Sequence, residues 1–109
     1  MVVKTTKGDL PVRYGWSALA KFGDLCGMNM DKVMAMDLAK MKMSDMLKFI
    51  LVGFEDGARK EGVECQFKTV EDIGDLLDED ISVMGKVMEA FSDMAKSRIQ
   101  KEEATTKKK

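Results

Sequence analysis

The first fourteen residues and the rest of the chain follow two different patterns of apolar and polar positions. Segment 1–14 alternates apolar and polar side chains, which predicts a short β-hairpin with its turn at Lys7-Gly8-Asp9. Pro11 confines the second strand, Leu10–Tyr14, to a sheet edge because proline has no N–H to donate. After Gly15 the apolar spacing becomes helical, so we expect helices from residue 16 onward.

Three helices are predicted between residues 16 and 61. The first covers 16–26 and ends before Gly27. Its predicted apolar face comprises Trp16, Leu19, Phe22, Leu25 and Cys26. A short second helix is expected from about Asp31 to Ala39. The third follows an N-cap at Ser44 and runs to about Glu61, with Gly62 in the C-terminal position; its unusually apolar centre predicts a central place in the core.

Two more helices complete the predicted domain. Thr69 and Asp72 have the spacing of a capping box, which predicts a short fourth helix with an apolar stripe. That stripe comprises Val70, Ile73 and Leu77. The fifth helix is expected from Asp80 to about Gln100, with one apolar seam. That seam comprises Ile81, Met84, Met88, Phe91 and Ala95. We therefore expect a mainly α fold: one domain over 1–99, with a hairpin in 1–14 and about five helices in 16–99, and a charged, disordered tail over 100–109.

Composition argues against most enzymatic chemistry. The chain has 109 residues and no His, the commonest general base and zinc ligand. Asp72, Asp75 and Glu79 could serve a metal-assisted hydrolase, but a solvated acidic helix surface is the favoured interpretation, and no His is present to activate Cys26 or Cys65. We expect no catalytic residues, no metal and no cofactor.

Charge and hydropathy also restrict the partners. The formal charge is -1, from 18 basic and 19 acidic residues, which gives no electrostatic basis for binding nucleic acid. The longest nearly apolar stretch, Met46–Phe54, is far shorter than the roughly 20 residues that cross a bilayer, and no secretory signal opens the chain. We therefore expect a cytoplasmic protein without a membrane partner.

Methionines are concentrated in one part of the sequence. Seven of the 11 lie between Met28 and Met46, more than one short helix can bury on a single stripe. Unbranched, polarizable Met side chains adapt to varied apolar surfaces, which suits a protein that binds helical partners. A loosely specified core explains the cluster equally well. Trp16 is a possible aromatic anchor for a partner, with a core role as its alternative.

Gly53 and Gly57 have the spacing that lets another backbone approach a helix closely. The neighbour can belong to the same chain or to another subunit. Packing within the chain is the commoner case and the one we favour.

Four segments following a short N-terminal β unit resemble the tail assembly chaperones of long-tailed bacteriophages. They are Trp16–Phe22, Leu25–Gly27, Leu51–Ala58 and Thr69–Ile73. The resemblance implies a small, helical, non-catalytic protein of the host cytoplasm that coats the tape measure protein, helps recruit tail tube subunits and leaves before the virion is complete.

The resemblance also suggests roles for particular residues. Met30, Met34, Met36 and Met41 become candidates for contact with the tape measure protein, and homo-oligomerisation is expected through two candidate surfaces. These are the fifth helix, with Met84, Met88 and Phe91, and the Gly53/Gly57 face. The alternatives are a minor tail or connector protein retained in the virion, and a small cytosolic helical adaptor unrelated to phage.

Overall fold

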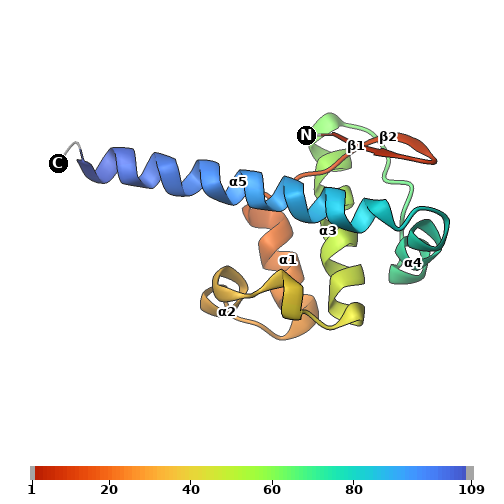
Figure 1. The fold of residues 1–109 in the computed structure, drawn as a ribbon, viewed down its shortest axis with the longest axis horizontal. Coiled ribbons are helices and arrows are strands. Elements are labelled where there is room, and N and C mark those ends of the chain that lie inside the picture. Colours follow the sequence, from red (N-terminus) through yellow and green to blue (C-terminus); the bar gives the residue numbers. More distant parts are fainter. Residues whose placement is uncertain (1, 108–109) are drawn as a thin grey trace.

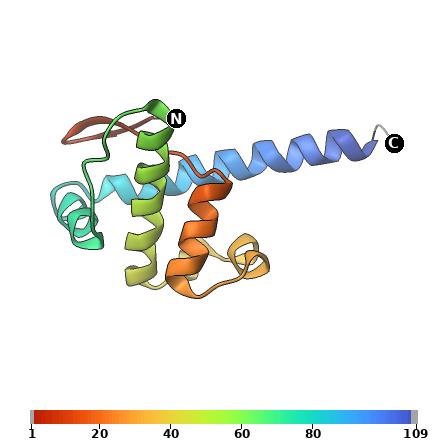
Figure 2. The same ribbon diagram turned by 180° about the vertical axis from the view of Figure 1, so that it is seen from behind.

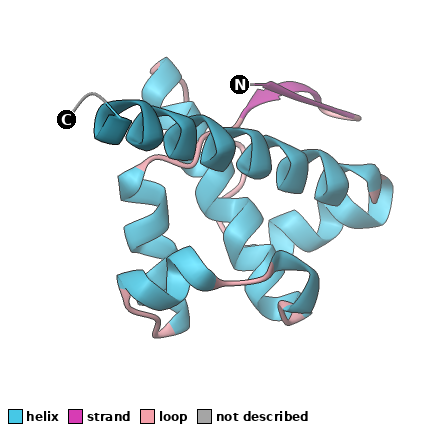
Figure 3. Cartoon of the chain, turned by 60° about the vertical axis from the view of Figure 1, so that its left-hand side comes forward, coloured by secondary structure: helices cyan, strands magenta, loops and turns pink. Residues whose placement is uncertain are grey.

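A computed structural model describes residues 2–107, with side chains for residues 2–95 (Figure 1). Within this part of the chain the fold is mainly helical with an N-terminal hairpin, as predicted. Its elements are β1 (Val2–Thr5), β2 (Gly8–Pro11), α1 (Trp16–Cys26), α2 (Met30–Ala35), the 3₁₀ turn η1 (Leu38–Lys40), α3 (Met43–Glu61), α4 (Val70–Glu79) and α5 (Ser82–Lys107). Figure 3 shows the hairpin at the outside of the helical body.

The hairpin is confirmed, but its turn lies at Thr6-Lys7 where Lys7-Gly8-Asp9 was predicted, and its second strand is Gly8–Pro11 where Leu10–Tyr14 was predicted. β1 and β2 pair antiparallel with Val3 opposite Leu10, and the turn is followed by Gly8 at a positive φ of 102°. β2 ends at Pro11 because the next segment turns to α3, where the Arg13 N–H donates to the Gly53 carbonyl at 3.0 Å. Tyr14 is therefore delivered to the core by an extended segment outside the strand.

α1 and α3 lie side by side and form the centre of the molecule (Figures 1 and 2). Both end at a left-handed glycine, Gly27 and Gly62, as predicted. The α3 start differs from the prediction: Lys42 is the N-cap without a side-chain bond, and Ser44 is already helical. α1 buries a narrow stripe of Ala18, Leu19, Phe22 and Gly23, whereas Trp16 and Leu25, both predicted on its apolar face, are exposed.

The predicted second helix over 31–39 is divided in two. Asn29 caps α2 by accepting the Lys32 N–H, and the helix ends after Ala35. Met36 adopts an extended conformation, and the Asp37 carboxylate caps the short 3₁₀ turn that follows. Asn29 and Asp37 therefore start separate turns within the segment for which one helix was predicted.

α4 begins at the predicted capping box. The Asp72 N–H donates to the Thr69 hydroxyl at 3.3 Å, and the Thr69 N–H donates back to the Asp72 carboxylate at 3.2 Å. On this helix Ile73 and Leu77 are buried as predicted, Leu76 is buried with them, and Val70 is partly buried.

α5 differs from its predicted bounds and seam. It starts at Ser82, and its buried stripe is Val83, Val87 and Ala90, whereas the predicted seam residue Ile81 precedes the helix and is exposed. The helix continues to Lys107, so the predicted end near Gln100 is wrong and residues 100–107, expected to be disordered, are helical. Residues 108–109 of the predicted tail lie outside the described residues.

Aromatic rings join the main elements in one core. Tyr14 stacks on Phe49 of α3 with ring centroids 4.4 Å apart, and its hydroxyl donates to the Phe49 carbonyl at 2.8 Å. Phe22 of α1 and Phe91 of α5 meet the Phe49 ring edge-on at 5.2 and 5.1 Å. The hairpin exit, α1, α3 and α5 therefore share one packing centre.

Candidate functional site

Exposed apolar side chains gather at one end of the molecule. Of the eight large hydrophobic residues exposed in the described part of the chain, four come from the end of α1, from α2 and from the start of α3. They are Leu25, Met30, Met34 and Met43. These elements lie at the bottom of Figure 1, at the end of α3 remote from the hairpin. We call these four residues the methionine surface.

α2 positions the centre of this surface. Its one buried side chain, Val33, attaches the helix to the core. Met30 and Met34 are one helical turn apart and therefore share a face, with 45% and 55% of their surface exposed. The Asn29 cap and Val33 thus hold a short helix that presents two flexible apolar side chains to solvent.

The other two candidate methionines are placed differently. Met36 and Met41 are partly buried and pack against the core. Met36 and Leu38 flank the break between α2 and η1, so their packing attaches this irregular segment to the body. The four methionines grouped by the sequence interpretation therefore divide into two exposed and two supporting side chains.

Trp16 does not join the methionine surface. It is the first residue of α1 and is 57% exposed, whereas Leu25 is near the other end of the helix. The length of α1 separates the two ends by about 15 Å. Leu25 and Met43, which do belong to the surface, were missed by the sequence interpretation: Leu25 was assigned to the buried face, and Met43 was not singled out.

Gly53 and Gly57 pack against the chain's own extended segment. A Cβ at Gly53 would meet the ring of Tyr14, and one at Gly57 would lie 2.5 Å from the Pro11 carbonyl. The close neighbour is thus intramolecular, the case that we favoured, and it is the extended segment that follows β2. This glycine face is occupied within the monomer.

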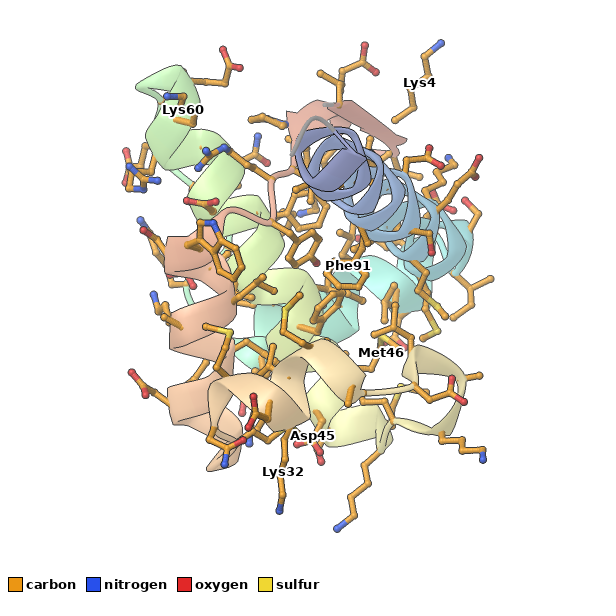
Figure 4. The ribbon with its side chains drawn as sticks, turned by 90° about the vertical axis from the view of Figure 1, so that its left-hand side faces the viewer. Lys4, Lys32, Asp45, Met46, Lys60 and Phe91 are labelled. Atoms are coloured by element: carbon orange, nitrogen blue, oxygen red, sulfur yellow. The ribbon has the colours of Figure 1, made fainter. Side chains whose placement is uncertain are left out.

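The residues proposed for self-association on α5 also contact the chain's own core. Met84 and Met88 are partly buried and flank the stripe of Val83, Val87 and Ala90. Phe91 lies on the side of α5 that faces the body (Figure 4), with its ring edge-on to Tyr14 at 5.4 Å. These side chains therefore attach α5 to the core of the same chain.

A buried carboxylate links α3 to the start of α1. Asp56, 5% exposed, accepts hydrogen bonds from Arg59 at 2.7 Å, the Gly15 N–H at 3.0 Å and Arg13 at 3.2 Å. Burial alone raises the pKa of Asp56, but the Arg59 and Gly15 hydrogen bonds and the Arg13 charge together hold this pKa below its ordinary value. An acidic residue inside an apolar helix, with Arg at i+3, was a signal that the sequence interpretation did not use.

The acidic residues considered for a metal-assisted hydrolase do not converge. Among the described residues, no three Cys, Asp or Glu side chains are arranged to hold a metal ion. Hydrogen bonds from the Lys68 and Thr69 N–H groups lower the pKa of Asp72, whose carboxylate thus serves the α4 cap. Burial and the neighbouring Asp45 raise the pKa of the Cys26 thiol, which opposes formation of a nucleophilic thiolate.

Comparisons with protein-family models, curated proteins and solved structures found no match. Within the described part of the chain, every helix is too short or too polar to cross a membrane.

Proposed function

We propose that this protein is a non-catalytic tail assembly chaperone of a long-tailed bacteriophage, and that its methionine surface binds helical segments of the tape measure protein in the host cytoplasm. The observation that carries the proposal is the exposure of Met30 and Met34 on one face of α2, with Leu25 and Met43 on the adjoining elements. Exposed apolar side chains on several elements are a typical feature of protein-binding surfaces.

The chemistry of the surface suits a client of variable sequence. A long helical protein presents successive apolar stripes that differ in shape, and Met side chains change rotamer to fit them at little strain. The supports of the surface, Val33, Met36 and Met41, are buried or partly buried. Buried supporting residues beneath flexible, exposed Met side chains thus favour binding to helices of varied sequence.

Release before virion completion, recruitment of tail tube subunits and homo-oligomerisation belong to the proposal by resemblance. Because the Gly53/Gly57 face and Met84, Met88 and Phe91 pack within the monomer, the proposed oligomer would use other exposed surfaces.

Co-expression with the tape measure protein, the large helical protein encoded downstream in a phage tail gene cluster, tests this proposal. The native chain is expected to co-purify with it, whereas a Met30→Ser, Met34→Ser variant should lose most of the capture. Unfolding of that variant in urea should change by less than about 1 kcal/mol because both side chains are already exposed. Ile81→Ser, at an exposed apolar residue outside the surface, is the matched control and should retain full capture.

Mass spectrometry of mature particles distinguishes the alternatives. Capture of the tape measure protein with absence from particles supports a transient chaperone. Stoichiometric presence in particles indicates a minor tail or connector protein instead. If the chain neither captures the tape measure protein nor is present in particles, the phage assignment is contradicted and a cytosolic adaptor is favoured.

A further inference from the structure

A second apolar surface lies at the opposite end of α3. A groove of about 440 Å³ is enclosed by β2, the last turns of α3 and the segment that leads to α4. Its apolar lining includes Leu10, Pro11, Phe54, Ala58, Val63 and Phe67. Figure 2 shows the segment after α3 passing beside the hairpin on its way to α4. The volume is within the usual range of ligand pockets, roughly 300–1,000 Å³.

Two buried aromatic side chains and two exposed aliphatic ones line the groove. Phe54 and Phe67 are both buried and lie against each other with ring centroids 5.2 Å apart. Val2 and Val63, at 58% and 54% exposure, are two of the eight exposed large hydrophobic residues of the described chain. An occupant would therefore bury apolar surface that the monomer leaves in water.

The end of α3 directs its basic side chains away from this groove. Arg59 pairs with Asp56 at 2.7 Å, and Lys60 lines an adjoining hollow, which shares Pro11 and Glu61 with the groove. Ala58 and Glu61, one turn apart, are the residues of this last turn that face the groove. The α3 face that borders the groove is thus apolar with a carboxylate at its edge.

The charged side chains of described residues that line the groove all have one sign. Asp9, Glu61 and Glu64 contribute carboxylates, and among the described residues no Lys or Arg side chain lines it. Glu64 is paired with Lys68 at 3.3 Å, but Asp9 and Glu61 have no ion pair within the described part of the chain. The carboxyl end of α3 adds partial negative charge at the same place. The groove therefore favours an apolar group accompanied by cations.

Pro11, at the groove, cannot pair with an added β-strand. β2 ends at Pro11, which has no N–H, and the Pro11 carbonyl lies against Gly57 of α3. Pro11 therefore offers no N–H to an occupant of the groove.

We propose that this groove is a second docking site, which takes a linear segment of another protein whose apolar side chains are flanked by Lys or Arg. The α3 residues that line the groove, Phe54 to Glu61, lie about 16 to 27 Å along the helix from Met43 of the methionine surface. The protein thus has two docking sites at opposite ends of one rigid helix and can hold two protein segments at once. The groove proposal does not depend on the identity of the client of the methionine surface.

Binding of a labelled synthetic peptide, two leucines flanked on each side by two lysines, tests the groove by fluorescence anisotropy on the full chain. Glu61→Lys and Val63→Ser should each weaken binding about tenfold, which corresponds to about 1.4 kcal/mol. The matched controls, Asp78→Lys and Ile81→Ser at exposed positions outside the groove, should bind as the native chain does. Met30→Ser, Met34→Ser should also leave peptide binding unchanged, which separates this test from that of the proposed function.

Two further peptides and one hydrodynamic measurement complete the test. Peptides with serine in place of leucine, or glutamate in place of lysine, should not bind. Equal loss of binding in the groove and control variants, or no binding of the leucine–lysine peptide by the native chain, would overturn the proposal. Sedimentation that shows self-association abolished by Val63→Ser would overturn it in favour of a second copy as the occupant.

Discussion

At the scale of single residues, two glycines that both lie inside helices have different roles. Gly53 and Gly74 are both inside helices, where glycine lowers helix stability relative to alanine by about 1 kcal/mol. Tyr14 occupies the space in which a Gly53 Cβ would lie, whereas a Cβ at Gly74 would meet nothing within 4 Å. Only the tertiary neighbour distinguishes a required glycine from a replaceable one.

Gly53→Ala is therefore expected to destabilise the fold by about 1–3 kcal/mol because the added methyl displaces the buried Tyr14 ring. Gly74→Ala should instead stabilise it by about 0.5–1 kcal/mol through helix propensity. Urea unfolding of both variants measures the two effects. A stabilising Gly53→Ala change would mean that Tyr14 is not packed against α3 as described.

At the scale of elements, Asp56 fixes the start of α1 to α3. Gly15 caps α1 without a side-chain bond of its own, and its N–H donates to the Asp56 carboxylate. A negative charge beside a helix N-terminus is also favourable for the helix dipole. The connection thus combines the Gly15 hydrogen bond with an ion pair to Arg13, while Arg59 pairs with Asp56 within α3.

Because the pKa of Asp56 is lowered in the folded state, its charge stabilises the fold above the unfolded pKa of about 3.9, and this contribution is lost as pH falls through the folded pKa. Asp56→Asn should cost about 1–3 kcal/mol at pH 7, and the difference from the native chain should shrink toward pH 3. Denaturant unfolding at both pH values measures it. Asp78→Asn, an exposed control, should change stability by less than about 0.5 kcal/mol. A difference independent of pH would contradict the role of the Asp56 charge.

At the scale of the whole molecule, Tyr14 reports the integrity of the core. It is the single tyrosine of the chain, and its ring contacts Phe49 of α3 and Phe91 of α5. Complete burial raises the pKa of Tyr14 well above its ordinary value. Ionisation therefore requires the packing centre shared by these elements to open.

Tyrosinate absorbance should consequently appear only together with the loss of helical circular dichroism as pH is raised. Since the folded pKa is raised, the contribution of Tyr14 to stability is present below the unfolded pKa of about 10 and is lost above it. The chain unfolded in urea is the control and should titrate near pH 10. A Tyr14 that ionises while the helices persist would contradict the described core.

Local signals in the sequence determined most of the elements. The capping box at Thr69 and Asp72, the helix ends at Gly27 and Gly62, and the hairpin depend on a few neighbouring residues, so their patterns predicted them. The choice of which apolar side chains are buried depends on distant neighbours. Met34 and Met36 are two positions apart, yet one is exposed and the other packs on the core, because α2 ends between them.

The two proposed docking sites show the same division. Clustered methionines in the sequence indicated a partner surface, but only the fold removed Met36, Met41 and Trp16 from it and added Leu25 and Met43. The groove could not be predicted from the sequence because it is lined by Asp9, Glu61 and Val63, which come from separate parts of the chain. Side-chain patterns determine local structure, whereas a surface is determined by the tertiary contacts that cover some residues and leave others in solvent.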